Sequence, residues 1–168
     1  MALSTEIRRS ERYKGDGNRT QFPFPFKVFD PSHVVVEVSV NEYENKTLPT
    51  SSYKVTLNKD QENTPGGQVT LTTPLADGTK LVVVSNVPYL QEIVFQNQGG
   101  FFPEHLNTAH DLLTMQTQQL KEKIDRALLV PVTEEKTPQQ LTEELLSAQA
   151  EAKKFANAAA ESANAAAK

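Results

Sequence analysis

The stretch that decides the organisation of this chain is residues 103–128, which read PEHLNTAHDLLTMQTQQLKEKIDRAL. Its apolar or weakly polar positions recur at alternating steps of four and three residues, which is a heptad period. These positions are Leu106, His110, Leu113, Thr117, Leu120, Ile124 and Ala127. Pro103 suits the first turn of a helix, and Glu104 suits its positive N-terminal end. The stretch therefore predicts a long amphipathic helix that stops at Pro131.

A helix with such a stripe has two ways to bury it. It can pack on the chain's own preceding domain, which is the simpler alternative, or it can associate with copies of itself in a coiled coil. The stripe is narrow, as in a coiled-coil seam, and hydrated residues such as Gln118 and Lys121 flank it. His110 and Thr117 form polar layers, which lower stability but can fix register and strand number. We therefore favour self-association through this stripe.

Composition changes sharply near residue 100. Thirteen of the 15 valines and 9 of the 12 aromatic residues lie at or before that position, whereas 13 of the 15 alanines lie after it. Valine and aromatic residues favour strands, and alanine favours helices. The chain is therefore expected to be α+β, with a β domain at residues 21–100 followed by helices.

Alternating apolar residues predict the strands of this β domain. Phe22, Phe24 and Phe26 are separated by two prolines, which cannot donate ladder hydrogen bonds, so they predict an edge strand or an extended arm. Further strands are predicted at residues 34–40, 53–57, 69–72, 81–84 and 93–95, with turn signals between them. Strands at this spacing predict a small antiparallel β-sandwich or barrel.

The C-terminal part predicts a second helix. Pro138 follows Thr137, a plausible N-cap, and 11 of the last 21 residues are alanine. We expect a self-associating helix at 101–130, a linker at 131–138 and an alanine-rich helix at 139–168. Because no Gly or Pro stops this helix, we expect it to be the front part of something longer.

Composition disfavours several functional classes. The 168 residues include 17 Lys and Arg against 21 Asp and Glu, a net charge of −4, which disfavours nucleic-acid binding through bulk charge. The absence of cysteine excludes disulfides and thiol nucleophiles. No apolar run approaches the roughly 20 residues of a membrane-spanning helix, and no apolar stretch precedes the first charges as in a signal peptide. We expect synthesis in the cytoplasm and no membrane partner.

No catalytic or metal-binding motif stands out. The chain has no G-x-S-x-G, H-E-x-x-H or P-loop sequence. His105 and His110 are five residues apart, so they point to different sides of a helix, and His33 is isolated. We expect no metal, no cofactor and no enzymatic activity in this segment. A hydrolase with a carboxylate pair is the enzymatic alternative, but no pattern places two carboxylates around a cleft.

The N-terminal residues 1–20 carry charges of both signs, with Arg8, Arg9 and Arg12 interleaved with acidic residues. They predict either a solvated terminus or an arm that orders when it docks on an acidic partner.

The motifs resemble, in order, the N-terminal virion-anchoring domain of bacteriophage tail fibres and tailspikes of the T7 type. The resemblance begins with Tyr13, Gly15-Asp16-Gly17 and the Phe22–Phe26 stretch. It continues through residues 52–57, 67–71, 76–81, 101–111 and 118–120 and covers about residues 11–130. The alanine-rich end resembles the shafts of such fibres.

The resemblance implies a homotrimer in the virion tail that attaches the fibre or spike to adaptor and nozzle proteins. The trimer interface is then expected at Leu106, His110, Leu113, Thr117, Leu120 and Ile124, within a trimeric coiled-coil shaft. Tail docking is expected at Arg8, Arg9, Arg12, Tyr13, Phe22, Phe24 and Phe26. Host recognition or polysaccharide cleavage is expected in a C-terminal part beyond this sequence. A trimeric surface adhesin and the anchor of a full-length polysaccharide depolymerase are the alternatives.

Overall fold

A computed structural model describes residues 3, 5–41, 44–91, 93–94, 102–127 and 136–166. The chain forms two compact units, Met1–Glu122 and Lys123–Lys168. The strands and helices are β1 (Tyr13–Lys14), β2 (Gln21–Phe24), β3 (Val34–Ser39), β4 (Asn45–Thr47), β5 (Tyr53–Leu57), β6 (Gly67–Leu71), β7 (Lys80–Ser85), α1 (Pro103–Asp125) and α2 (Pro138–Ala166). Short 3₁₀ turns at Pro31–His33 and Thr50–Ser52 precede β3 and β5.

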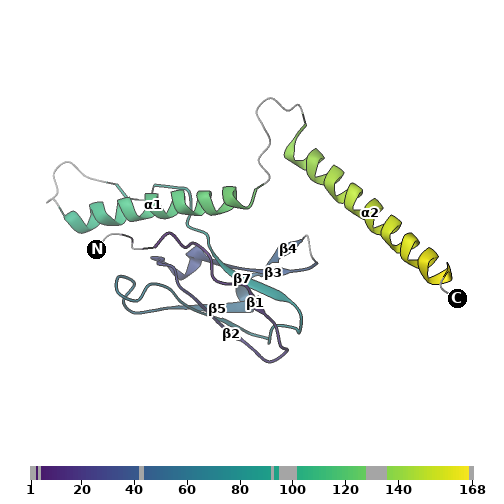
Figure 1. The fold of residues 1–168 in the computed structure, drawn as a ribbon. Helices are drawn as coiled ribbons and strands as arrows, with labels where there is room; N and C mark the ends of the chain where they lie inside the picture. Colours follow the sequence, from purple (N-terminus) through teal and green to yellow (C-terminus); the bar gives the residue numbers. More distant parts are fainter. Residues whose placement is uncertain are drawn as a thin grey trace. The chain divides into compact units, whose positions relative to one another are not determined.

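Two antiparallel sheets form a sandwich in the first unit (Figure 1). One sheet has the strand order β1-β7-β3-β4, and the other has the order β2-β6-β5. Side chains that alternate along each strand meet between the sheets, and Phe22, Val36, Val69 and Val83 there are 0% exposed. The α+β class with antiparallel sheets is thus confirmed. Each sheet keeps its own edges, so the barrel alternative is not what the chain forms.

The first three residues of the Phe-Pro-Phe-Pro-Phe stretch lie in an edge strand, one of the two alternatives that its prolines predict. Strand β2 pairs only with β6, with Phe22 opposite Val69 and Pro23 opposite Gln68. Its phenylalanines point into the core, and the Tyr13 hydroxyl donates to the carbonyl oxygen of Pro23 at 2.6 Å. Proline is tolerated here because the outer edge of β2 has no neighbouring strand to receive an N–H.

The expectation of a separate N-terminal arm is wrong from Arg8 onward. The Ser10 N–H donates to the Val83 carbonyl at 2.8 Å, and the Ser85 N–H donates to the Arg8 carbonyl at 2.8 Å. Strand β1 then pairs with β7 through Tyr13 and Leu81. The segment from Arg8 to Lys14 therefore completes the edge of the first sheet, because it satisfies backbone groups of β7 that would otherwise lack partners.

The other predicted strands have mixed outcomes. The strands expected around residues 34–40, 53–57, 69–72 and 81–84 are confirmed as β3, β5, β6 and β7. Strand β4 lies in a region that was expected to be a turn. Ile93 and Val94 are not in a strand, and Phe95 lies outside the described residues.

Helix α2 begins as predicted. The Gln140 N–H donates to the Thr137 hydroxyl oxygen at 3.3 Å, and the Thr137 N–H donates to Gln140 Oε1 at 2.8 Å, a reciprocal cap. Its described apolar side chains are largely exposed, with Leu145 at 62% and Phe155 at 74%. Residues 131–135 of the linker expected at 131–138 lie outside the described residues, as do residues 128–130 of the preceding expected helix. Over the described residues, neither helix is sufficiently long and apolar to cross a membrane.

Candidate self-association interface

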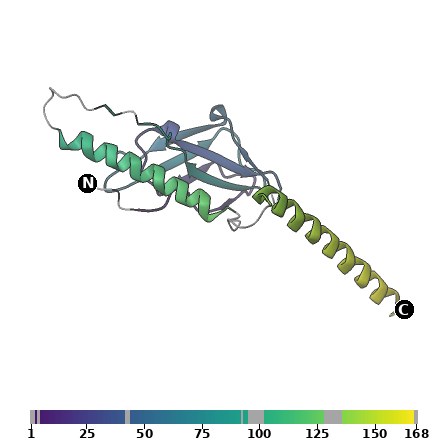
Figure 2. The same ribbon diagram turned by 90° about the horizontal axis from the view of Figure 1, so that it is seen from above.

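Helix α1 lies along one side of the sandwich (Figures 1 and 2). Three side chains on one helical face are buried there: Asp111, Met115 and Gln119. They are four residues apart, so they lie above one another on the same side of the helix. We call this set the inner face of α1. Met115 is 0% exposed and is the only apolar one of the three, so polar contacts carry much of the attachment.

A buried ion pair fastens the first half of the inner face. Lys27 Nζ lies 2.8 Å from Asp111 Oδ2, and the same ammonium also donates to Glu62. Burial by itself lowers the pKa of Lys27, but the hydrogen bonds to Asp111 and Glu62 outweigh it, and the net effect raises the pKa. The ammonium therefore stays charged, and Asp111 is tied to one point on the sandwich.

Gln119 fastens the second half of the inner face. Its Oε1 accepts from the Val87 N–H at 2.8 Å and from the Ser85 hydroxyl at 3.2 Å, while its Nε2 donates to the Val87 carbonyl at 3.2 Å. Both backbone groups of Val87 are thus paired by one side chain, as a neighbouring strand would pair them. Gln116 Nε2 donates to the carbonyls of Pro88 at 2.6 Å and Leu90 at 3.1 Å. The segment after β7 is therefore held against α1.

The N-terminal segment also reaches α1. Arg9 Nε lies 3.1 Å from Glu122 Oε1. Arg8 is 1% exposed, donates from Nη1 to the Lys27 carbonyl at 3.0 Å and lies 5.8 Å from the centre of the Phe26 ring. Burial lowers the pKa of Arg8 to about 10. These contacts join the N-terminal segment directly to Glu122 of α1 and to Lys27, which is paired with Asp111 of α1.

The heptad stripe faces away from the sandwich. We call the six expected interface residues the outer face of α1: Leu106, His110, Leu113, Thr117, Leu120 and Ile124. Leu113 is 62% exposed, Leu120 50% and Ile124 45%, while Leu106 is half-buried. The helix thus packs on its own domain, but it does so through another face. A single chain leaves most of the outer face uncovered.

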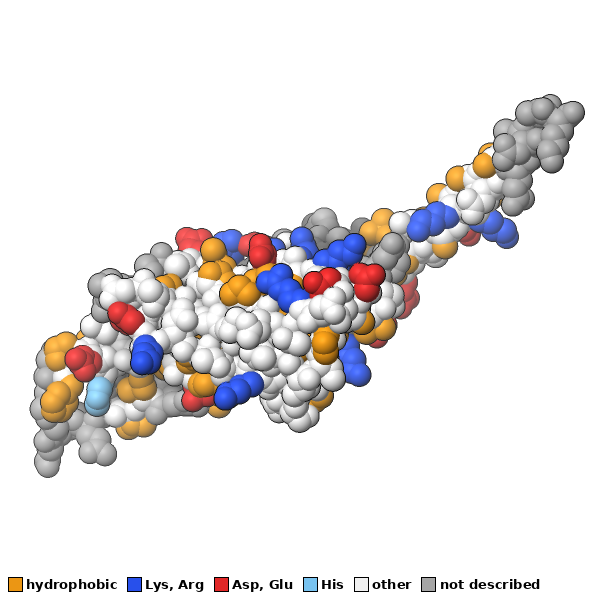
Figure 3. All heavy atoms as spheres, turned by 90° about the horizontal axis from the view of Figure 1, so that it is seen from below, with side chains coloured by type: hydrophobic (Ala, Val, Ile, Leu, Met, Phe, Trp, Pro, Cys, Tyr) orange, Lys and Arg blue, Asp and Glu red, His pale blue; other side chains and the backbone are white. Residues whose placement is uncertain are grey.

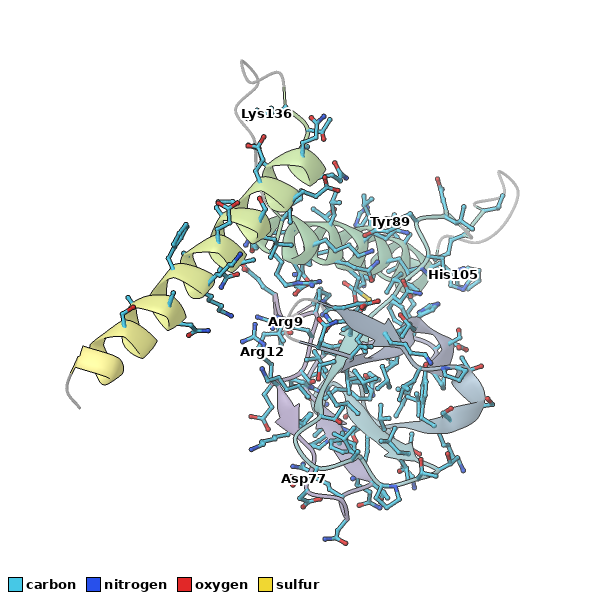
Figure 4. The ribbon with its side chains drawn as sticks, turned by 90° about the vertical axis from the view of Figure 1, so that its right-hand side faces the viewer. Arg9, Arg12, Asp77, Tyr89, His105 and Lys136 are labelled. Carbon is cyan, nitrogen blue, oxygen red and sulfur yellow. The ribbon has the colours of Figure 1, made fainter. Side chains whose placement is uncertain are left out.

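A groove continues the outer face over the first half of α1. It has a volume of about 240 Å³, and its apolar lining includes Leu90, Ile93, Leu106, Ala109 and Leu113. Large apolar side chains adjoin it in sequence and are exposed. These are Tyr89 at 51%, which lies beside α1 in Figure 4, Val94 at 82% and Phe102 at 62%. Exposed apolar surface of this extent is typical of an interaction site.

Most of the expected tail-docking residues are not on the surface. Arg8, Tyr13, Phe22, Phe24 and Phe26 are buried, so docking through these five side chains is wrong for this fold. The reason is that the alternating aromatic face that marked them points between the two sheets. The other two, Arg9 and Arg12, also come from the N-terminal segment (Figure 4). Arg9 is half-buried in its ion pair with Glu122, and Arg12 is exposed.

Charges and metal-ligating groups are dispersed in the single chain. Acidic and basic side chains are interspersed over the face drawn in Figure 3. His105 lies against Phe102, with ring centres 5.7 Å apart. Within the described part of one chain, no three His, Asp or Glu side chains are grouped so that they could hold a metal ion.

Sequence reasoning missed the inner face. Its members are mostly polar, so they produce no hydrophobic period, and their partners Lys27 and Val87 are distant in sequence. The spacing of four between Asp111, Met115 and Gln119 was the only available signal.

Comparison with known proteins supports a phage origin. No family model matches the chain. The chain is 36% identical over 132 residues to the tail spike protein of Salmonella phage epsilon15. The matched region comprises 78% of this chain but 12% of that relative, so the chain corresponds to a small part of it. This similarity supports a tail spike-like protein that is a structural component of the phage tail.

Proposed function

We propose that this chain is the module that attaches a tail spike to the virion tail, and that three copies associate through the outer face of α1. The similarity to a tail spike protein supports the structural role in the tail. The observation that carries the trimer proposal is the orientation of α1. Its polar inner face is tied to the sandwich at Asp111 and Gln119, so the apolar heptad stripe is presented outward.

The outer face suits a parallel coiled coil. Leu106, Leu113 and Leu120 occupy one heptad position, and His110, Thr117 and Ile124 occupy the other. The Thr117 hydroxyl donates to the Leu113 carbonyl of its own helix at 2.9 Å. Burial of Thr117 in the seam therefore leaves no unsatisfied hydroxyl donor. Each sandwich contacts the inner face of its own helix, on the side opposite the outer face. In the trimer, three sandwiches therefore surround the three associated helices.

A trimer also explains how such a module holds a spike firmly. Once one sandwich has docked on the tail, the other two contacts become intramolecular, which raises the overall affinity. We propose that the adaptor and nozzle proteins of the tail are the partners. They contact exposed surface, such as Arg12 and the apolar group Tyr89, Val94 and Phe102, rather than the buried aromatic residues of β2. Host recognition and any polysaccharide cleavage then belong to other parts of the full-length spike.

The trimer is tested by the mass of the chain in solution. Light scattering after size exclusion should give about 56 kDa, three times the 18.6 kDa chain. The variant Leu113→Asp with Leu120→Asp places charges in the seam and should yield monomers with unchanged far-UV circular dichroism. The matched control, Asn107→Asp with Thr114→Asp, adds the same charges on exposed positions of α1 outside the stripe and should remain trimeric.

Two results count against the proposal. A wild-type mass of 18.6 kDa at all accessible concentrations would exclude self-association through this chain. A trimer that persists in the Leu113→Asp, Leu120→Asp variant would place the interface elsewhere than on α1.

A further inference from the structure

His110 differs from the other residues of the outer face. It lies between Leu106 and Leu113, and Leu106, Ala109 and Leu113 line the groove around it. His110 is exposed in the single chain and its imidazole makes no hydrogen bond to another described residue, whereas the Thr117 hydroxyl is satisfied within its own helix. Gln91 and Gln116, the polar residues nearest in the groove, already donate to backbone carbonyls. His110 is therefore the polar residue of the stripe whose side chain makes no hydrogen bond within the described part of its own chain.

Rotation of α1 cannot remove His110 from an interface. The inner face is tied by the Lys27–Asp111 ion pair and by the hydrogen bonds of Gln119, which fix the orientation of the helix. Any association through the outer face therefore buries the imidazole together with its leucine neighbours. Burial of a polar group without a hydrogen-bond partner is unfavourable.

Three copies bring three such imidazoles together. A closed three-fold arrangement places identical residues at one level around the axis. The His110 side chains then converge on the axis, with leucine layers about 4 to 6 Å above and below, given a rise of 1.5 Å per residue. Three ring nitrogens that meet in an apolar enclosure form the ligand set of a four-coordinate metal site with one open position.

We propose that the His110 layer of the trimer is a binding site for one divalent transition-metal ion, of which Zn²⁺ is the model. This inference rests on the trimer of the proposed function. Neutral imidazole is a common metal ligand, and three of them leave the fourth position to water. Metal binding supplies each imidazole with the partner that the protein does not offer. A single chain supplies one of the three imidazoles, because His105 lies against Phe102 with the two rings tilted by 38°.

None of the described residues that line the groove carries a formal charge. The titratable residues nearest on the helix are His105, which lies on Phe102, and Asp111, which is paired with Lys27 on the inner face. Within the described lining of the groove, His110 is therefore the residue whose ring nitrogen is suited to bind the ion.

The test uses the full chain, first stripped of metal with a chelator and then titrated with Zn²⁺ by calorimetry near pH 7.5. We expect one ion per three chains, a visible absorption band typical of tetrahedral Co²⁺ on cobalt substitution, and roughly tenfold tighter trimerisation at saturating metal. The variant His110→Leu fills the layer with an apolar side chain, so it should form trimers that bind no Zn²⁺. The matched control His105→Leu removes a histidine from the same helix and should bind Zn²⁺ as the wild type does.

The outcomes separate the two proposals. A wild-type trimer that binds no Zn²⁺, or that binds it equally well with His110→Leu, overturns the metal site and leaves the trimer intact. A stoichiometry other than one ion per three chains also overturns it. A wild-type chain that is monomeric with and without Zn²⁺ overturns the proposed function itself.

Discussion

At the scale of single residues, Gly17, Gly66 and Gly78 have positive φ, a backbone conformation that favours glycine, and the first two form an instructive pair. Gly66 has φ of +100°, and a Cβ there would lie 2.0 Å from the Phe24 carbonyl oxygen. Gly17 has φ of +75°, but a Cβ there would meet open space. The two positions thus share a positive φ and differ in the room available for a side chain.

This pair separates backbone strain from steric overlap. Gly17→Ala should lower the free energy of unfolding by about 1 kcal/mol, the usual cost of a positive φ. Gly66→Ala should lower it by about 3 kcal/mol or more, because β2 must also move away from β6. Urea unfolding measures both values, and equal losses would show that the contact with Phe24 relaxes freely.

The Lys27–Asp111 ion pair permits a second residue-scale prediction. Lys27→Met should cost about 3 kcal/mol or more because it leaves Asp111 buried and unpaired. Asp111→Leu should cost less, because Glu62 remains to pair with Lys27. The loss of unfolding free energy in the double variant should be smaller than the sum of the losses in the two single variants. A double-mutant cycle based on urea unfolding measures this difference.

The pKa shift of Lys27 determines how the stability contributed by the Lys27–Asp111 ion pair changes with pH. The pKa of Lys27 is raised on folding, so its contribution is complete at neutral pH and is lost only as the pH rises through the folded value. The coupling between Lys27 and Asp111 should therefore be the same at pH 7 and pH 8. A coupling near zero would mean that the pair does not hold α1 to the sandwich.

At the scale of elements, α1 has two faces with different tasks. Met115 on the inner face is 0% exposed, whereas Leu113 on the outer face is 62% exposed. The inner face joins the helix to its own sandwich, and the outer face is available to other copies. Substitutions two residues apart should therefore change different quantities.

Met115→Ala should lower the free energy of unfolding by about 2 to 4 kcal/mol, as expected for loss of a buried side chain. Leu113→Ala should leave the unfolding of the isolated monomer nearly unchanged and should weaken self-association. Urea unfolding at low concentration and light scattering at high concentration distinguish the two effects. A large loss of monomer stability from Leu113→Ala would contradict this division.

At the scale of the whole molecule, the N-terminal segment is an integral part of the sandwich. Three hydrogen bonds join Arg8 and Ser10 to β7, including one from the Val83 N–H to the Ser10 hydroxyl oxygen at 2.9 Å. Arg8 also donates to the carbonyl of Lys27, and the ammonium of Lys27 is paired with Asp111 of α1. The segment thus pairs with the first sheet and also contacts Lys27, the residue that binds α1.

Deletion of residues 1–12 removes the three hydrogen bonds to β7 and the one from Arg8 to the Lys27 carbonyl, so it should destabilise the chain by about 4 kcal/mol at about 1 kcal/mol for each bond. Deletion of residues 1–4 is the control and should leave the thermal midpoint nearly unchanged. If both truncated chains melt at the same temperature, the segment is not a structural strand.

The features predicted correctly from the sequence depend on local periodicity and local chemistry. The alternating phenylalanines marked an inward-facing strand, and their prolines restricted it to a sheet edge. Thr137 before Pro138 marked the start of α2. The heptad spacing identified a single side of α1 as apolar. Each of these signals lies within a few residues, so the chain carries it before any tertiary contact forms.

The features that sequence reasoning missed depend on partners distant along the chain. The segment from Arg8 to Ser10 looked like a charged arm, because only the free edge of β7 shows that its backbone has a place to pair. Asp111 and Gln119 carry no sign of burial in the sequence, because their partners Lys27 and Val87 become neighbours only after folding. The sequence alone therefore determined which residues form strands, helices and an apolar stripe. Only the tertiary structure decided which side of α1 is held and which is presented outward, because polar contacts between distant residues leave no periodic trace.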